Sequence, residues 1–191
     1  MLTITAIAFV SLTAVIWVFG TVTLDQQAFE TIIELATPGV VRVMKVVNYA
    51  GEKLVLIPAM VVLYVVFRRA RRQWWIWAAL MVAARIAERL VKLAVGRARP
   101  MGEGFAFPSG HVTAAAAYFG TVFYLAGSLS SPALRVTIRA AALATIVLVA
   151  LARIVLRAHW PSDTLAGAAL GLALASSAAL AASAQVRAVE G

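Results

Sequence analysis

Long runs of apolar residues, each about as long as a bilayer is thick, limit what this chain can fold into more than any other feature. The first run, Leu2–Val22, contains no charged residue, and a membrane-crossing helix needs roughly 20 apolar residues. Of the 191 residues, 63% are hydrophobic and only 13% are charged. So few charges could not coat a soluble domain of this length. The sequence therefore predicts an all-α, polytopic membrane protein.

Six runs are long enough to cross a membrane. They are Leu2–Val22, Ala50–Phe67, Trp74–Val95, Ser109–Ser128, Val136–Leu156 and Thr164–Val186. The first lacks the basic start of a signal peptide and is predicted to be a retained helix, and the last is rich in Gly, Ala and Ser, which favours close helix contact. Residues 23–49 mix charged and apolar residues at helical spacing, which predicts an amphipathic helix at the interface. We expect one domain over 1–191, with its motif-bearing core at about 74–186.

The basic residues predict an orientation. The densest group, Arg68 to Arg72, follows the second run and is expected in the cytoplasm, because short loops rich in Lys and Arg stay there. Six crossings then place both termini in the cytoplasm and the loops 96–108 and 157–163 together on the extracytoplasmic face, in a bacterial inner membrane. The net charge of +9 favours anionic membrane lipids as partners. We find no signature of nucleic-acid binding, and the oligomeric state is not predicted.

The third run carries charges that lipid cannot surround. Arg85, Glu88, Arg89 and Lys92 lie at helical spacing on one face, and charges at membrane depth normally face a bundle interior or a wet cavity. One interpretation is that Glu88 only pairs with a neighbouring cation and holds helices together. The other is that this face lines a functional cavity. Lys92 favours the second interpretation, because it lies nearest to the loop that follows.

A Pro-Ser-Gly-His cluster stands directly before a run of small apolar residues. Pro108 and Ser109 predict a helix start, where free N–H groups and the helix dipole attract anions. Gly110 would let a ligand approach the backbone closely, and His111 can exchange a proton near neutral pH. The alternative is a capped helix with an incidental histidine.

The second of the two histidines lies between an arginine and an aspartate. His159 follows Arg153 by six residues and precedes Asp163 by four. A carboxylate near an imidazole fixes its tautomer and raises its basicity, and a guanidinium is well suited to phosphate. The alternative is that Arg153 and Arg157 only reach for lipid headgroups while Asp163 starts the last helix.

Taken together, the three clusters resemble the type-2 phosphatidic acid phosphatase superfamily, whose signature is K-x6-RP, PSGH and SR-x5-H-x3-D. The chain has Lys92-LAVGRA-Arg99-Pro100, then PSGH at 108–111, then Ala152-Arg153-IVLRA-His159-WPS-Asp163. Order and spacing agree with the signature. Ala152 stands where the pattern has serine, so one possible hydrogen bond is missing while the charged positions remain.

The resemblance implies a fold of six membrane helices and a set of catalytic roles. His159 would attack phosphorus and form a phosphohistidine, Asp163 would orient His159, and His111 would protonate the leaving oxygen and then activate water. The residues implied to hold the phosphoryl oxygens are Lys92, Arg99, Ser109, Gly110 and Arg153. Neither a metal nor another cofactor is implied, since cations and a helix N-terminus can stabilise a phosphoryl group.

Three alternatives have less support. A zinc site is disfavoured, because the surrounding Arg and Lys side chains would repel a cation. A lipid or anion transporter could use the same basic cavity without hydrolysis, but it has no use for a nucleophile beside a carboxylate. A vanadate-dependent haloperoxidase resembles the family at the same motifs, yet such enzymes are soluble.

The substrate is predicted from what the chain lacks. Only a short loop joins the third and fourth runs, so the pocket must open close to the bilayer, where a lipid phosphate can react while its tail stays in lipid. Arg97 and Arg157 add cations beyond those that one phosphate requires. We therefore expect undecaprenyl diphosphate, ahead of phosphatidylglycerol phosphate and phosphatidic acid. The alternative is that Arg97 and Arg157 only anchor to headgroups.

Overall fold

The computed structural model describes residues 1–190, with side chains for residues 1–188. Nine α-helices follow one another in this part of the chain. They are α1 (Leu2–Phe19), α2 (Thr23–Glu34), α3 (Pro38–Asn48), α4 (Lys53–Val66), α5 (Arg68–Arg72), α6 (Trp74–Val95), α7 (Gly110–Leu125), α8 (Pro132–Val155) and α9 (Pro161–Glu190), with short 3-10 turns at Tyr49–Gly51 and Ala126–Ser128. The predicted all-α class is confirmed for these residues. Gly191, at the end of the predicted domain, lies outside them.

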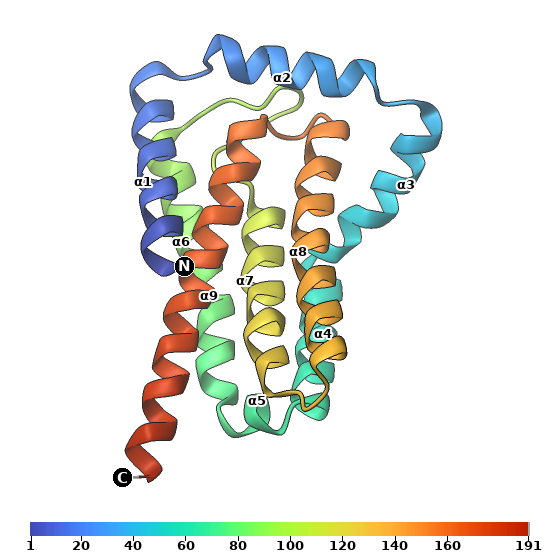
Figure 1. Cartoon of the computed structure of the whole chain (residues 1–191). Coiled ribbons are helices and arrows are strands. Elements are labelled where there is room, and N and C mark those ends of the chain that lie inside the picture. The colour runs from blue at the N-terminus through green and yellow to red at the C-terminus, as the bar shows by residue number, and fades with distance from the viewer. Residues whose placement is uncertain (191) are drawn as a thin grey trace.

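Helix α7 lies inside the bundle and packs against α6, α8 and α9 (Figure 1). Three consecutive alanines, Ala115, Ala116 and Ala117, have no exposed surface. Helix α9 meets α7 with glycine: a Cβ atom added to Gly171 would lie 2.5 Å from the backbone oxygen of Thr113. Small residues let two helix backbones approach this closely. The contact fixes the first turns of α7 and α9 relative to each other, and both turns carry residues of the predicted site.

Three helices are long and apolar enough to cross a membrane by themselves, namely α1, α8 and α9. A fourth candidate combines α3 and α4, which are bent by 55° at the break between Gly51 and Lys53. Helix α6 has the predicted bounds and sufficient length, but it carries the four charged residues of one face. Helix α7 has only 16 residues. By length and composition, the described residues therefore supply three or four candidate spans of an integral membrane protein, where six were predicted.

The segment predicted to be one interfacial helix, residues 23–49, is divided into two helices. Helix α2 lies across one end of the bundle, and α3 runs obliquely from there toward α4 (Figure 1). The division has a local cause. Thr37 caps α3 by accepting a hydrogen bond from the Val40 N–H at 3.4 Å, and Pro38 occupies the first turn. Proline favours a helix start and disfavours helical backbone in the residue before it, so α2 cannot continue into α3.

Candidate active site

The three sequence motifs meet at the end of the bundle over which α2 lies. A cavity of about 650 Å³ opens there between α4, α6, α7 and α8. Among the residues that line it are Lys92, Arg99, Gly110, His111, Arg153 and His159. The fold thus brings both histidines and the three motif cations to one cavity, although they come from positions as far apart as 92 and 159.

His159 lies in the loop between α8 and α9 and is only 1% exposed. Its Nδ1 atom is 3.6 Å from Oδ2 of Asp163, which is longer than a hydrogen bond. Burial lowers the pKa of His159 from its ordinary value to about 4, although Asp163 acts in the opposite direction. The imidazole is therefore neutral at physiological pH. With Asp163 on its Nδ1 side, Nε2 is the nitrogen that remains for a substrate.

Asp163 is held on both sides by other groups. Its Oδ2 atom accepts a hydrogen bond from the Trp160 N–H at 2.8 Å, and its Oδ1 atom accepts one from Arg97 at 2.6 Å. Its backbone oxygen accepts the N–H of Ser109 at 2.9 Å, which ties the start of α9 to the start of α7. Ser109 itself is fully buried at the N-cap of α7. The carboxylate is therefore fixed before any substrate binds.

His111 has a carboxylate partner that sequence analysis missed. Its Nε2 atom lies 2.8 Å from Oε1 of Glu52, which stands at the break before α4. Asn48 donates to the same Glu52 oxygen at 3.4 Å and accepts a hydrogen bond from Arg153 at 2.9 Å. Glu52 is a single acidic residue at the start of an apolar run, and that position was the only signal available in the sequence. These contacts join the segment after α3 to His111 and to Arg153.

The charged face of α6 forms ion pairs within its own helix and also lines the cavity. Glu88 is 2% exposed and forms ion pairs with Lys92 and, at 2.7 Å, with Arg85. Lys92 also lines the cavity. Gly110 also lines the cavity, and a Cβ atom there would lie 2.8 Å from Oε1 of Glu88. The missing side chain of Gly110 makes room for Glu88, so the space beside it is already occupied by this carboxylate.

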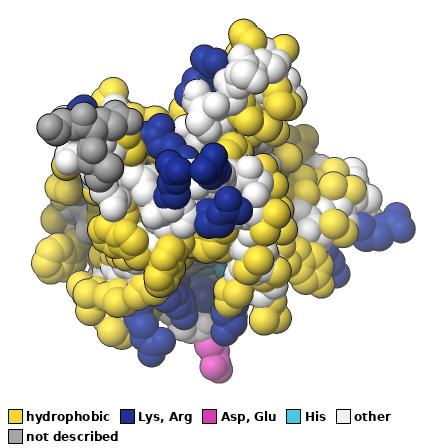
Figure 2. Space-filling view, turned by 90° about the horizontal axis from the view of Figure 1, so that it is seen from below, with side chains coloured by type: hydrophobic (Ala, Val, Ile, Leu, Met, Phe, Trp, Pro, Cys, Tyr) yellow, Lys and Arg dark blue, Asp and Glu magenta, His cyan; other side chains and the backbone are white. Residues whose placement is uncertain are grey.

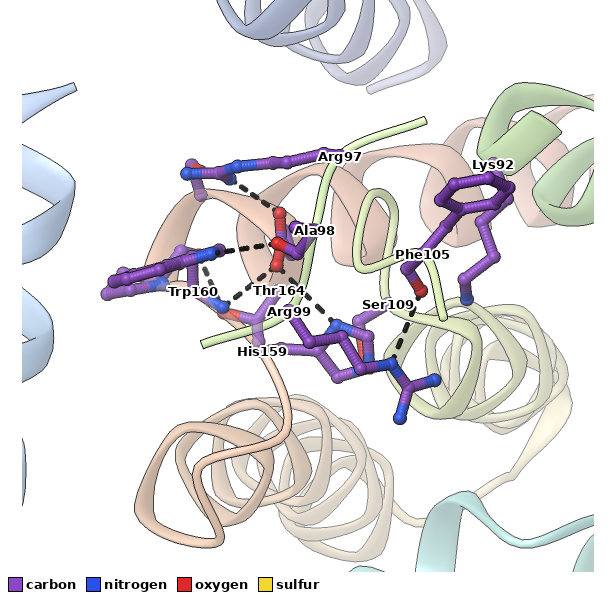
Figure 3. Close-up of polar contacts among 12 residues, drawn as sticks. Lys92, Arg97, Ala98, Arg99, Phe105, Ser109, His159, Trp160 and Thr164 are labelled. Carbon is purple, nitrogen blue, oxygen red and sulfur yellow. Dashed lines mark hydrogen bonds and ion pairs between the residues drawn. The ribbon is translucent and has the colours of Figure 1, made fainter. Parts of the chain in front are cut away.

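The remaining predicted cations differ in their surroundings, and Figure 3 shows two of them, Arg97 and Arg99. Arg99 is half-buried at the cavity and donates from Nε to the Phe105 backbone oxygen at 3.4 Å. Arg97 is 6% exposed and lies over the Trp160 ring, outside the cavity lining. Arg157 is exposed, has a positive φ of 55° and contacts the Met101 sulfur at 3.8 Å. The expectation that Arg97 and Arg157 add charge to the phosphate pocket has no support in this arrangement, because neither residue lines the cavity.

Arg97 instead joins three elements of the fold. Its guanidinium donates to Oδ1 of Asp163, to the Ser162 hydroxyl at 2.7 Å and to Oδ2 of Asp25 on α2. Asp25 is 5% exposed and also accepts the backbone N–H of Ser162 at 2.8 Å. Phe29, one turn further along α2, lies 5.0 Å from the Trp160 ring between centroids. Helix α2 is thus bound to the loop that carries His159.

Comparisons with known proteins agree with this geometry. A family model described as the PAP2 superfamily matches residues 94–187. The crystal structure of a PAP2-type phosphatidylglycerolphosphate phosphatase from Bacillus subtilis is similar with a TM-score of 0.77 and 26% identity, over 93% of each chain.

The crystal structure of Aquifex aeolicus LpxE has a similar fold, with a TM-score of 0.63 and 18% identity over 84% of this chain and 97% of that one. No curated protein matches the sequence. The family match over residues 94–187 and the shared fold, together with the three motifs gathered at one cavity, place the motif-bearing half of this chain in the PAP2 superfamily.

Proposed function

We propose that this protein is a membrane lipid phosphatase that works through a phosphohistidine. The observation that carries the proposal is a neutral His159 beside Asp163, at a cavity shared with His111 and lined by cations. A transporter of lipids or anions, the alternative, would need the cations alone. The similar Bacillus subtilis structure is a phosphatase of a lipid phosphate, which supports the same chemistry here.

The reaction follows from the two histidines. Nε2 of His159 attacks phosphorus, the P–O bond to the lipid breaks, and His111 gives its proton to the leaving oxygen. Water then gives a proton to His111 and attacks the phosphohistidine, so that the P–N bond breaks and inorganic phosphate leaves. Glu52 holds the His111 ring and stabilises its protonated form. Asp163 stabilises the positive charge that His159 acquires in the first step.

The cations of the cavity stabilise the phosphoryl group during transfer. Lys92, Arg99 and Arg153 line the cavity beside His159, and phosphoryl transfer depends chiefly on positioning and charge stabilisation. Gly110 lines the cavity at the N-terminus of α7, which favours an anion. Ser109 is buried, donates its N–H to Asp163 and does not line the cavity. The roles implied for the three cations and for Gly110 are therefore compatible with the positions of these residues.

Arg97 and Asp25 lie outside the cavity and hold Asp163 in position. Arg97 occupies Oδ1 of Asp163, which leaves Oδ2 on the side of His159. Asp25 pairs with the same guanidinium, and this limits how strongly Arg97 neutralises the charge of Asp163. We assign both residues a positioning role in the reaction, because they act through Asp163 and do not line the cavity.

The cavity favours a lipid with one reacting phosphate. Below the cations it is lined by apolar side chains of α4 and α6, including Leu56, Met60 and Met81, which suit an acyl chain. The argument for a second phosphate loses both of its cations, because Arg97 and Arg157 lie outside the cavity. We therefore place phosphatidylglycerol phosphate first, ahead of phosphatidic acid and undecaprenyl diphosphate.

Phosphate release from purified protein tests the function and the substrate together. We expect kcat/KM to be highest for phosphatidylglycerol phosphate among these three lipids, and Arg157→Ala to leave the ranking unchanged. His159→Ala serves as the inactive control. Transport of intact lipid phosphate across vesicles without any phosphate release would favour the transporter instead.

The absence of an acidic metal site from the described part of the chain leads to a prediction about inhibitors. Activity should persist in excess chelator, because side-chain cations supply the charge stabilisation. Orthovanadate should inhibit competitively as a phosphate mimic. Loss of turnover in chelator that is restored by a divalent ion would contradict this assignment.

We further propose six crossings, by α1, α4, α6, α7, α8 and α9, with both termini in the cytoplasm of a bacterium and the cavity on the extracytoplasmic side of the inner membrane. The exposed residues Glu103 and Arg71 lie at opposite ends of the bundle. Single cysteines at these positions in the cysteine-free chain should react with an impermeant thiol reagent only from outside and only from inside, respectively. Opposite labelling would invert the orientation and place the substrate in the cytoplasmic leaflet.

A further inference from the structure

The end of the bundle remote from the active-site cavity carries many Arg side chains and few acidic ones. Figure 2 shows Lys and Arg side chains gathered near the middle of this face. They come from α5, which is Arg-Arg-Ala-Arg-Arg, and from the first turns of α8, where Arg135 and Arg139 lie. The seven acidic residues with described side chains belong to α2, to the loop 96–109 or to the surroundings of the active site. This end therefore lacks internal counter-charges among residues 1–188.

The cations surround a second cavity, of about 690 Å³. Three of the four α5 arginines, Arg68, Arg69 and Arg72, line it, whereas Arg71 does not. The rest of the wall includes apolar side chains such as Phe67 and Leu129. A cavity with guanidinium groups on one part of its wall and apolar side chains on another matches a molecule with a charged head and an apolar tail.

Two polar atoms in the wall lack a partner. Gln73 is 4% exposed, and its Nε2 donates to the Ala182 backbone oxygen at 2.7 Å, but its Oε1 has no hydrogen bond. Nε of Arg69 is likewise buried without a partner, while its guanidinium lies over the Tyr124 ring. Buried polar atoms are nearly always paired in proteins. An acceptor and a donor at one cavity indicate a ligand that offers both a hydroxyl group and an anionic oxygen.

We propose that this cavity binds the headgroup of an anionic phospholipid whose headgroup carries hydroxyl groups, such as phosphatidylglycerol. The arginines bind its phosphodiester, Oε1 of Gln73 accepts a hydrogen bond from the headgroup, and the apolar wall contacts the acyl chains. Trp74 and Trp75, at the start of α6, are 58% and 52% exposed, and tryptophan is enriched at the level of lipid headgroups. Their position favours a membrane lipid over a soluble phosphate ester.

Lipid titration of the purified, detergent-solubilised protein tests the proposal, with bound lipid counted by native mass spectrometry. The wild type should bind phosphatidylglycerol at least tenfold more tightly than phosphatidylcholine. Arg69→Gln with Arg72→Gln should remove most of this preference. Arg72→Gln alone should weaken phosphatidylglycerol binding, whereas Arg71→Gln, which removes the same single charge from the same helix but outside the cavity, should change the affinity less than twofold. Circular dichroism and gel filtration show whether each variant is folded.

Other outcomes would overturn the proposal. Equal losses from Arg71→Gln and from Arg72→Gln would show general attraction between a basic surface and anionic lipid. Displacement of the lipid by soluble glycerol phosphate at similar concentration would show a site for free phosphate esters. Gln73→Met should weaken phosphatidylglycerol more than an anionic lipid without headgroup hydroxyls, and equal weakening would exclude the hydrogen bond to Gln73. The readout is binding, so these results do not depend on whether the protein is a phosphatase.

Discussion

Replacing His159 with alanine should abolish phosphate release, with a loss on the order of 10³-fold or more, as expected when a nucleophile is removed. The reason is that His159 is buried and neutral with Asp163 on its Nδ1 side, whereas His111 is partly exposed and its Nε2 atom is already engaged by Glu52. Rapid acid-free quenching of the wild type with ³²P-labelled substrate should trap a phosphoenzyme that is labile in acid and stable in base. The variant should carry no label.

His111 provides the matched comparison for this experiment. His111→Asn should lower turnover of a lipid phosphate by about 10² to 10⁴-fold, the usual contribution of a general acid or base. With a substrate whose leaving group needs no proton, such as p-nitrophenyl phosphate, the same variant should still form the phosphoenzyme and then accumulate it, because water is no longer activated. Acid-labile label on the His159→Ala protein would refute the assignment of the nucleophile.

The Arg97→Met variant should have the second large effect, on stability and on catalysis together. It leaves the carboxylates of Asp25 and Asp163, which are 5% and 0% exposed, without their shared cation. Removing one partner of a buried ion pair destabilises a protein by about 3 to 5 kcal/mol. We therefore expect a large fall in the thermal unfolding temperature in detergent. We also expect a fall in kcat with KM little changed, because Arg97 does not line the cavity.

A double variant separates positioning from simple neutralisation. Asp25→Asn combined with Arg97→Met removes one negative and one positive charge, so most of the lost stability should return. Activity should not return, because Oδ1 of Asp163 still lacks the group that orients it, and small misplacements can cost about 10²-fold in rate. Full recovery of kcat would show that Arg97 only balances the charge of Asp25.

The NMR resonances of the histidines provide a second test of the positioning role of Arg97. A variant that only lowers stability would not change them in the same way. The chain has two histidines, so His159 can be followed by NMR in labelled protein. In the double variant the pKa of His159 should rise, since Asp163 is no longer neutralised by Arg97 and favours the imidazolium more strongly. Arg97→Lys should raise the pKa of His159 less than the double variant does, because the ammonium keeps a positive charge near Asp163. It should not match the wild type, because one ammonium cannot reach all three partners of the guanidinium. An unchanged pKa would contradict the proposed positioning role.

Local sequence patterns predicted the helices and the motifs well. Helix α6 begins and ends at the predicted residues, Trp74 and Val95, because its apolar run is bounded by basic residues and a glycine. The spacing of the three motifs was sufficient to select the residues that the fold gathers at one cavity. The break at Pro38 was also readable, since a Thr-Pro pair is a known helix start, but the helical spacing of charges on both sides of it obscured the signal.

The supporting residues could not be predicted, because they come from a segment without a motif of its own. Asp25 meets Arg97 across 72 positions and Ser162 across 137, and Glu52 meets His111 across 59. Helical periodicity reports which residues share a face of one helix, and it does not report which helix lies opposite. The contacts of Arg97 could not be predicted for the same reason: its charge was visible in the sequence, but its acidic partner on α2 was not.

The close contact of α7 and α9 leaves no room for larger side chains, whereas the cavity walls from α4 and α6 can accept substitutions. At Gly171 even one methyl group would force the two backbones apart, and this would move His111 relative to His159. The exposed parts of the walls contributed by α4 and α6 have no such constraint, since the lining residues Ile57 and Val82 are 64% and 59% exposed. Evolution can therefore reshape the tail-binding walls for a new lipid while the spacing of the two histidines is inherited unchanged.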